Sequence, residues 1–404
     1  MDGRNLVVCL DGTDNQFCAT NTNVVRMFQA LEQDPTRQIA YYDPGVGTIW
    51  EEGTLSKTYQ KVQMLFGMAF GLGVTRNVAQ AYAFLTRQYR ANDRIFIFGF
   101  SRGALEARAL AALIHRCGLL QDHLSSLSPY AIRLSQTPGG EDVVREFEAT
   151  FSRRAPVTFL GLWDTVTSMG NVWSPIHWPN TSFNPGVENV AHAIAIDERR
   201  AFFRQNRWRP SRGQVCSEVW FAGVHSDVGG GYPAHEGRLW AITLEWMAKR
   251  AIGAGLRLDD DRWRSVMSAG EPASTPDYAS EQHESLTGAW KPLEFVPRFR
   301  SEQNALGKWE KHLMIPARYA GVNGRPRELK PGERVHRTAV ERFVARPDYR
   351  PATLTRAGLD EVSARAFLDT PNDEWIVPDR SGRLATSAPE PSSHGAADDI
   401  EIMR

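Results

Sequence analysis

The chain has 404 residues, of which 42% are hydrophobic and 10% aromatic, as is typical of a globular protein with a large buried core. Its 47 Lys and Arg residues balance 47 Asp and Glu residues, so no overall positive field predicts a nucleic-acid partner. The N-terminus lacks a secretory signal, and no apolar run reaches the roughly 18 residues of a membrane span. These features predict a cytoplasmic protein, unless a specialised apparatus exports it.

Apolar stretches rich in β-branched and aromatic residues alternate with helical patterns along the first two thirds of the chain. Strands are expected at residues 6–10, 39–42, 94–98, 157–162 and 218–224. Helices are expected at residues 23–32, with a cap from Asn21 or Thr22, and at 74–89, 102–115, 188–199 and 239–251. Several of these strands are continuously apolar, as in parallel sheets covered on both faces. The alternation therefore predicts a doubly wound, mostly parallel α/β sheet.

The alternation weakens after residue 256, and this change suggests three regions. Residues 1–256 are expected to form the catalytic core, 257–379 an accessory region packed on it, and 380–404 a disordered tail. A Trp- and Pro-rich segment at 171–185 is typical of a loop or lid over a site. The glycine-interrupted apolar run at 62–74 favours a buried helix over a segment that contacts acyl chains.

The most informative segment is Gly99-Phe100-Ser101-Arg102-Gly103, between the third expected strand and an alanine- and leucine-rich helix. A strand, a G-x-S-x-G turn and a helix in this order predict a nucleophile elbow of the α/β-hydrolase type. The turn is so sharp that side chains in place of Gly99 or Gly103 would collide with the neighbouring strand or helix. Ser101 is therefore the candidate nucleophile, at the positive end of the following helix.

A serine nucleophile needs a histidine base and a carboxylate that orients it. Asp164 ends the expected strand 157–162, and His225 follows the expected strand 218–224, so both belong at the sheet edge that carries Ser101. Asp227 is the alternative acid, although it lies only two residues from His225. His336 is the alternative histidine.

An oxyanion hole requires two N–H donors, and we expect them from Arg102 and from Gly12 after the first strand. The Arg102 side chain can pair with Glu106, four residues along the helix, or attract an anionic head group. Asp11 and Asp227 could instead hold a divalent cation, although their spacing in the sequence does not require one. The four cysteines are scattered and lack metal-ligand spacing. The cysteine usage favours a reducing compartment, and no cofactor is predicted.

Six ordered motifs resemble the α/β-hydrolase family of the type VI secretion phospholipase effectors over roughly residues 4–256. The motifs are Leu10–Thr13, Pro44–Thr48, Gly99–Ala104, Leu162–Val166, Ala195–Arg200 and Gly223–Tyr232. The resemblance implies an esterase that acts on lipid carboxylic esters, with phospholipase A activity in characterised members. It places the triad on Ser101, Asp164 and His225, the residues that the strand ends also indicate.

The leading hypothesis is a serine hydrolase that cleaves carboxylic esters through an acyl-enzyme, with lipids as the expected substrates. The expected partners are an ester or lipid substrate and, peripherally, a membrane. A non-catalytic binding or effector module and a metal-dependent esterase are the alternative functions. Acyl length, head group, regiochemistry and oligomeric state are not predicted.

Overall fold

The computed structural model describes residues 3–12, 20–45, 70–137, 140–166, 178, 180–201, 203–269, 277–287, 290–295, 298–303, 309–314 and 324–379. Most of the lid predicted at 171–185, most of the apolar run at 62–74 and the tail predicted at 380–404 lie outside these residues.

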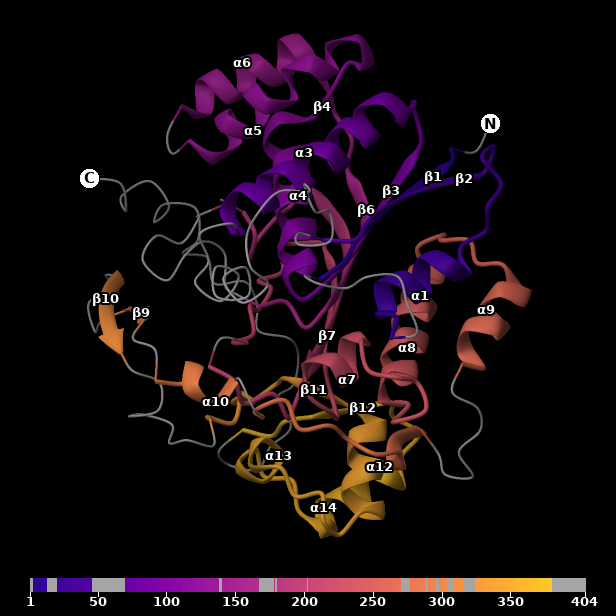
Figure 1. Cartoon of the computed structure of the whole chain (residues 1–404), viewed down its shortest axis with the longest axis vertical. Helices are drawn as coiled ribbons and strands as arrows, with labels where there is room; N and C mark the ends of the chain where they lie inside the picture. The colour runs from indigo at the N-terminus through magenta and orange to yellow at the C-terminus, as the bar shows by residue number, and fades with distance from the viewer. Residues whose placement is uncertain are drawn as a thin grey trace, which may run out of the picture.

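In the described part of the chain, eight strands form one sheet in the order β12-β11-β8-β7-β6-β3-β1-β2 (Figure 1). They are β1 (Asn5–Leu10), β2 (Gln38–Asp43), β3 (Arg94–Phe100), β6 (Val157–Trp163), β7 (Val187–Ala195), β8 (Val215–Phe221), β11 (Arg334–His336) and β12 (Glu374–Ile376). All neighbouring pairs are parallel except β11 and β12. This sheet confirms the predicted doubly wound α/β class.

Two antiparallel pairs lie apart from this sheet, β4 (Leu119–Leu120) with β5 (Ser152–Arg153) and β9 (Arg298–Gln303) with β10 (Trp309–Met314). The helices are α1 (Asn23–Ala30), α3 (Phe70–Gln88), α4 (Arg102–Cys117), α5 (Ser128–Gln136), α6 (Glu141–Phe151), α7 (His225–Gly229), α8 (Leu239–Gly253), α9 (Asp260–Met267), α10 (Trp290–Leu293), α12 (Arg337–Ala345), α13 (Ala352–Arg356) and α14 (Glu361–Leu368). Short 3₁₀ turns occupy Asp122–Leu127 and Asp277–Ala279. None of the described helices is long and apolar enough to cross a membrane.

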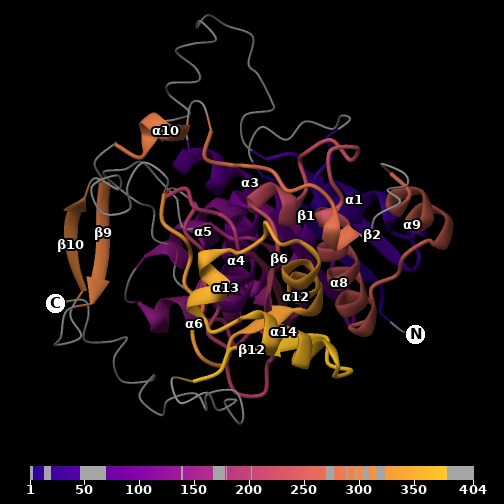
Figure 2. The ribbon, with the colours of Figure 1, turned by 90° about the horizontal axis from the view of Figure 1, so that it is seen from below.

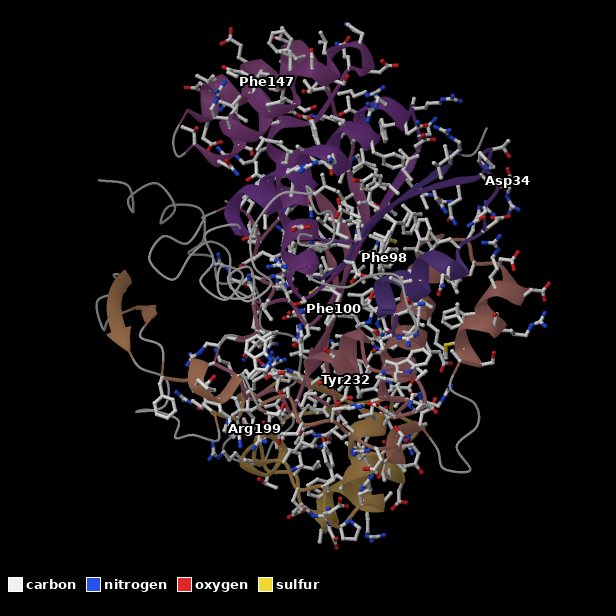
Figure 3. The ribbon with its side chains drawn as sticks, viewed as in Figure 1. Asp34, Phe98, Phe100, Phe147, Arg199 and Tyr232 are labelled. Atoms are coloured by element: carbon white, nitrogen blue, oxygen red, sulfur yellow. The ribbon has the colours of Figure 1, made fainter. Side chains whose placement is uncertain are left out.

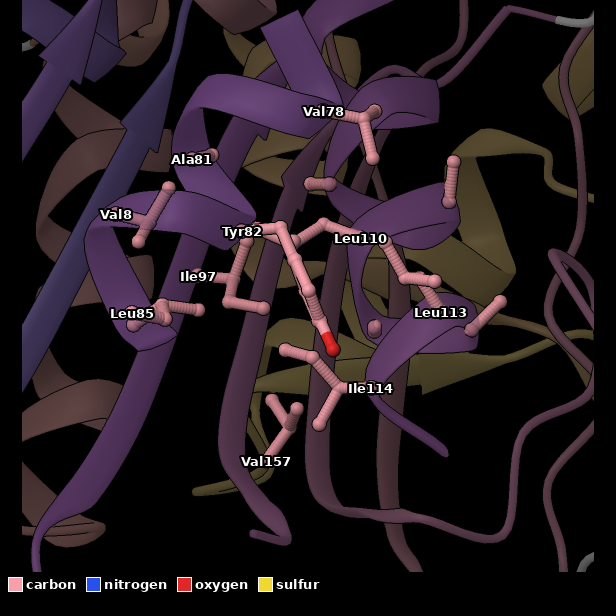
Figure 4. Close-up of a cluster of buried hydrophobic side chains, with 14 of the residues drawn as sticks. Val8, Val78, Ala81, Tyr82, Leu85, Ile97, Leu110, Leu113, Ile114 and Val157 are labelled. Carbon is pink, nitrogen blue, oxygen red and sulfur yellow. The ribbon is translucent and has the colours of Figure 1, made fainter. Parts of the chain in front are cut away.

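Helices cover both faces of the sheet, as continuously apolar parallel strands require (Figure 1). On one face α3 and α4 pack over β1, β3 and β6, with Val8, Ile97 and Leu110 among the buried contacts (Figure 4). The Tyr82 ring lies in the same cluster, and its hydroxyl donates to the Gly118 carbonyl at 2.8 Å, which satisfies its buried polar end. Helices α1, α8 and α9 cover the other face. Thr22 caps α1, which confirms one of the two predicted caps.

The segment 188–199, predicted as a helix, is instead mostly strand β7, and that prediction was wrong. Its alanines and terminal charges match a local helix pattern. In the structure, however, β7 pairs with β6 and β8, and its last six residues are buried. Burial between two strands overrides the intrinsic helix preference of alanine.

The region after residue 256 contributes directly to the main sheet. β11 pairs with β8 in parallel, and β12 completes the edge. Helices α12, α13 and α14 gather at this end of the molecule (Figure 2), where Phe343 and Leu354 pack with Trp220 of β8. Two strands of the predicted accessory region, β11 and β12, thus belong to the same sheet as the predicted core.

Candidate active site

Ser101 is the turn between β3 and α4, in backbone geometry that is rare for a residue with a side chain. Its φ is 58° and its ψ is −117°. Its backbone N–H donates to the Trp163 carbonyl at 3.0 Å, which ties the turn to the end of β6. Among the described residues, the Ser101 side chain makes no capping bond to α4. The hydroxyl is therefore not used to cap the N-terminus of the helix.

The two glycines of the turn stand where backbones cross closely. A Cβ added at Gly99 would lie 2.4 Å from the Gly103 carbonyl oxygen, and one at Gly103 would lie 2.2 Å from the Leu10 carbonyl oxygen. These distances confirm that the turn excludes side chains at both positions. The second contact also seats the start of α4 on the end of β1.

Asp164 follows β6 and is fully buried, with a φ of 38°. One carboxylate oxygen, Oδ1, accepts the Ala195 N–H at 3.0 Å. The other, Oδ2, lies 2.6 Å from Nδ1 of His225. The structure thus brings two of the predicted triad residues into direct contact.

His225 begins α7, just beyond the end of β8, and its ring lies between two aromatic rings. The ring centroids of Phe100 and Phe203 are 4.6 and 4.8 Å from that of the imidazole. Phe100 directly precedes Ser101, so the imidazole packs against the elbow. Phe100 can be found in Figure 3 between the labels of Phe98 and Tyr232. The buried Nε2 of His225 has no hydrogen-bond partner in the described part of the chain. The nitrogen that Asp164 does not hold is therefore not engaged by another described polar group.

The surroundings of this pair shift both pKa values downward, through charge at Asp164 and through burial at His225. Burial opposes ionisation of Asp164, but the charge of Arg327 and the bond to His225 hold its pKa well below its ordinary value. Burial lowers the pKa of His225, and the bond and charge of Asp164 only partly offset that effect. The pair therefore consists of an ionised carboxylate and a neutral imidazole at neutral pH.

Arg327 reaches Asp164 from a segment to which the sequence assigned no role. Its Nη1 donates to Oδ1 at 2.5 Å and its Nη2 to Oδ2 at 3.0 Å, and the guanidinium also binds the Ala195 and Phe203 carbonyls. Arg327 stands among many arginines without a motif or a periodic pattern, so no signal in the sequence distinguishes it.

A second ion pair holds the backbone of His225. Glu198 accepts the His225 N–H at 3.3 Å, the Ser285 hydroxyl at 3.0 Å and a bidentate contact from Arg200. Burial would raise the pKa of Glu198, but its bond and ion pair with Arg200 lower it. The Ala195–Arg200 motif, for which no separate role was predicted, therefore holds the backbone of His225 through Glu198.

The two alternative residues have other partners. Asp227 accepts the Val224 N–H at 3.0 Å and lies 2.6 Å from Nδ1 of His283, so it is not the carboxylate that contacts His225. His336 caps α12 and stacks on Phe221, and burial lowers its pKa to about 4. The structure thus brings neither alternative onto the Asp164–His225 pair.

The residues expected at the oxyanion hole lie at the ends of β1 and β3. Arg102 is the first residue of α4, and Gly12 follows β1. The Gly12 N–H donates to Oδ1 of Asp11 at 2.7 Å. The Arg102 side chain is buried, and its charge acts on Glu106, whose pKa burial nevertheless raises to about 8.

The two carboxylates considered for a cation bind different protein donors. Oδ2 of Asp11 accepts the hydroxyls of Thr22 at 2.8 Å and Tyr42 at 3.0 Å, whereas Asp227 binds His283. Among the described residues, no group of three or more His, Cys, Asp or Glu side chains has a metal-binding arrangement.

The comparison with protein families decides the identity of the core. The family model described as "T6SS, Phospholipase effector Tle1-like, catalytic domain" matches residues 4–250, more than half of the chain. The chain belongs to this family. The resemblance carried by the six motifs is thereby confirmed, and the Tle1-like catalytic domain contains Ser101, Asp164 and His225, whereas Arg327 follows it.

Three individual proteins also resemble this chain, each over only part of its own length. The chain is 33% identical over 226 residues to the uncharacterized protein YEL023C of Saccharomyces cerevisiae, a match that covers 52% of this chain and 33% of the yeast protein. An uncharacterized protein from Pseudomonas aeruginosa is 19% identical, with a TM-score of 0.40, over 67% of this chain and 49% of that one. The Tle1 effector, solved bound to the VgrG spike of the type 6 secretion system, is 19% identical, with a TM-score of 0.34, over 58% and 52%. The chain thus spans a third of the yeast relative and about half of each solved chain.

Proposed function

We propose that this chain hydrolyses carboxylic esters of phospholipids through a Ser-His-Asp acyl-enzyme mechanism. Membership of the phospholipase effector family supports the substrate class. The observation that carries the mechanism is the 2.6 Å contact between Asp164 and His225, packed through Phe100 against the strained turn at Ser101.

In this proposal Ser101 Oγ attacks the ester carbonyl while Nε2 of His225 takes the hydroxyl proton. Asp164 holds the Nδ1–H tautomer and stabilises the imidazolium that forms. The tetrahedral intermediate collapses, and the alcohol leaves with the proton from Nε2. Water then repeats the sequence on the acyl-enzyme, which releases a fatty acid and regenerates Ser101.

Negative charge on the intermediate requires N–H donors at the start of α4. The Arg102 N–H belongs to the first turn of α4, whose positive end favours an oxyanion beside Ser101. Gly12 is the proposed second donor, and its N–H would have to leave the Asp11 carboxylate to serve.

The test combines active-site labelling with product analysis. The wild-type chain, Ser101→Ala and the matched control Ser226→Ala are treated with a fluorophosphonate probe and, separately, with phosphatidylcholine vesicles. We expect labelling and release of fatty acid, measured by mass spectrometry, from the wild type and Ser226→Ala but not from Ser101→Ala. Absence of both signals from the wild type would favour a binding module, and activity in Ser101→Ala would exclude Ser101 as nucleophile.

A further inference from the structure

The guanidinium of Arg327 is buried against the outer side of the Asp164 carboxylate. The Arg327 side chain is 4% exposed and that of Asp164 is 0% exposed. Each terminal nitrogen of Arg327 contacts one carboxylate oxygen and one backbone carbonyl, that of Ala195 or Phe203. These four contacts match the four hydrogens of the two terminal nitrogens.

This arrangement fixes the orientation of Asp164. Oδ1 accepts from Arg327 and the Ala195 N–H, and Oδ2 accepts from Arg327 and His225. The carboxylate cannot rotate toward or away from the imidazole without breaking a charge-assisted bond. Ala195 closes the arrangement because its N–H binds Asp164 and its carbonyl binds Arg327.

Arg327 also changes the net charge next to the imidazole of His225. An isolated aspartate would favour the imidazolium, whereas a paired aspartate and guanidinium together carry no net charge. Among the described residues, Glu198 and Arg200 also act on the charge of His225, and they neutralise one another. The N–H of Thr165, the residue after Asp164, donates to Nε2 of His192 at 3.2 Å, and Asp227 on α7 is paired with His283. In the part of the chain that the structure describes, Arg327 is therefore the cation that directly contacts Asp164.

We propose that Arg327 is a positioning residue that locks the Asp164 carboxylate onto His225 and keeps the imidazole neutral until Ser101 gives up its proton. This inference rests on the proposed function, and it places a residue from outside the family-matched span 4–250 in direct contact with the triad. The charge of Arg327 is the largest effect that lowers the pKa of Asp164 against its burial.

Two variants separate the geometry of Arg327 from its charge. Arg327→Gln removes the charge, so protonation of the Asp164–His225 pair becomes easier. The midpoint of the acid limb of kcat/KM on a short acyl ester should then rise by about one pH unit. Arg327→Lys keeps the charge but loses the two-nitrogen contact with both oxygens of Asp164. We therefore expect kcat to fall by about tenfold while the midpoint stays near that of the wild type.

The matched control is Arg342→Gln, which removes a buried arginine of the same region that donates to the Tyr278 and Ser280 carbonyls. It should move neither the midpoint nor, by more than about twofold, kcat. A structural role for Arg327 would lower the rate of Arg327→Gln without moving its midpoint. An unmoved midpoint in folded Arg327→Gln, or a wild-type kcat in Arg327→Lys, overturns the proposal; if Arg327→Gln does not fold, the Lys variant decides.

A readout independent of turnover keeps this inference apart from the proposed function. The Nδ1–H of His225 should give a low-field proton resonance that is absent in His225→Gln, and its titration reports the pKa of the pair. That pKa should rise in Arg327→Gln. If Ser101→Ala retained the wild-type rate, the proposed function would be wrong. The titration would then still test whether Arg327 lowers the pKa of the Asp164–His225 pair.

Discussion

The ring of Phe100 packs against the imidazole of His225, with 4.6 Å between the two ring centroids. A Cβ added at Gly229 of α7 would lie 1.9 Å from a ring carbon of Phe100, so strand β3 and helix α7 are packed as closely as a glycine permits. Because Phe100 directly precedes Ser101, this packing sets where the candidate nucleophile stands relative to the candidate base. The Ser101 hydroxyl contributes nothing to that apolar contact.

Two substitutions at Ser101 should therefore separate catalysis from stability. Ser101→Ala and Ser101→Gly should both lower ester hydrolysis by three or more orders of magnitude, roughly the loss typical of a removed serine nucleophile. Ser101→Gly should be more stable than Ser101→Ala by about 1 kcal/mol, because a φ of 58° is strained for alanine and not for glycine. Activity assays and urea denaturation check the two effects. Equal stability of the variants would show that the turn carries no such strain.

A methyl group at Gly103 should disrupt the elbow. The added Cβ would meet the backbone oxygen of Leu10 at 2.2 Å, so α4 and β1 would have to separate. We expect Gly103→Ala to lower the free energy of unfolding by about 3 kcal/mol and to slow probe labelling of Ser101. Gly253→Ala is the control, since nothing lies within 4 Å of its added Cβ and alanine favours a helix. A Gly103→Ala chain as stable as Gly253→Ala would contradict the close crossing.

Asp164→Asn and Asp227→Asn should distinguish the two candidate acids. Of these two carboxylates, Asp164 is the one that contacts the imidazole of His225, so its amide variant should lose about three to four orders of magnitude in kcat. Asp227→Asn should retain most activity, because its partners are His283 and the Val224 N–H. Steady-state kinetics on a short acyl ester measure both. A larger loss in Asp227→Asn would transfer the role to that residue.

The site was predictable from the sequence where the order of elements determines it. Ser101, Asp164 and His225 each follow an apolar strand, and parallel strands place such residues at one edge. Strand β7 was missed because its alanines satisfy a local helix pattern and its pairing with β6 and β8 is not local. β11 and β12 have three residues each, too few for a periodic pattern. Arg327 depends on a contact 163 residues away in the chain, which no local signal encodes.

Activity should rise with pH through the pKa of His225, because only a neutral imidazole can accept the Ser101 proton. Burial lowers that pKa from 6.5, so we expect the midpoint of the acid limb below pH 6.5. Stability should also rise with pH in the same window, since the unfolded histidine binds a proton that the folded one does not, and lowering the pH therefore favours the unfolded chain. A kcat/KM profile and urea denaturation across this range test the direction. A midpoint above 6.5 would show that Asp164 dominates over burial.

Chelation should leave the hydrolysis rate unchanged. The oxygens of Asp11 are hydrogen-bonded to Thr22, Tyr42 and the Gly12 N–H, and Asp227 is paired with His283. Cation binding at either carboxylate would break these bonds. Assays with and without EDTA, followed by addition of magnesium or calcium, measure the effect. Loss on chelation with recovery on addition would support the metal-dependent alternative.

The late pairing of β11 with β8 has a consequence for synthesis of this chain. Until residues 334–336 leave the ribosome, β8 is the terminal strand of a growing sheet, and its backbone is open to other chains. Trp220, fully covered in the finished protein, is then without the α12–α14 layer that buries it. A fragment cut to the family-matched span would keep this exposed edge permanently, so expression of the isolated segment should yield aggregates where the full chain stays dispersed.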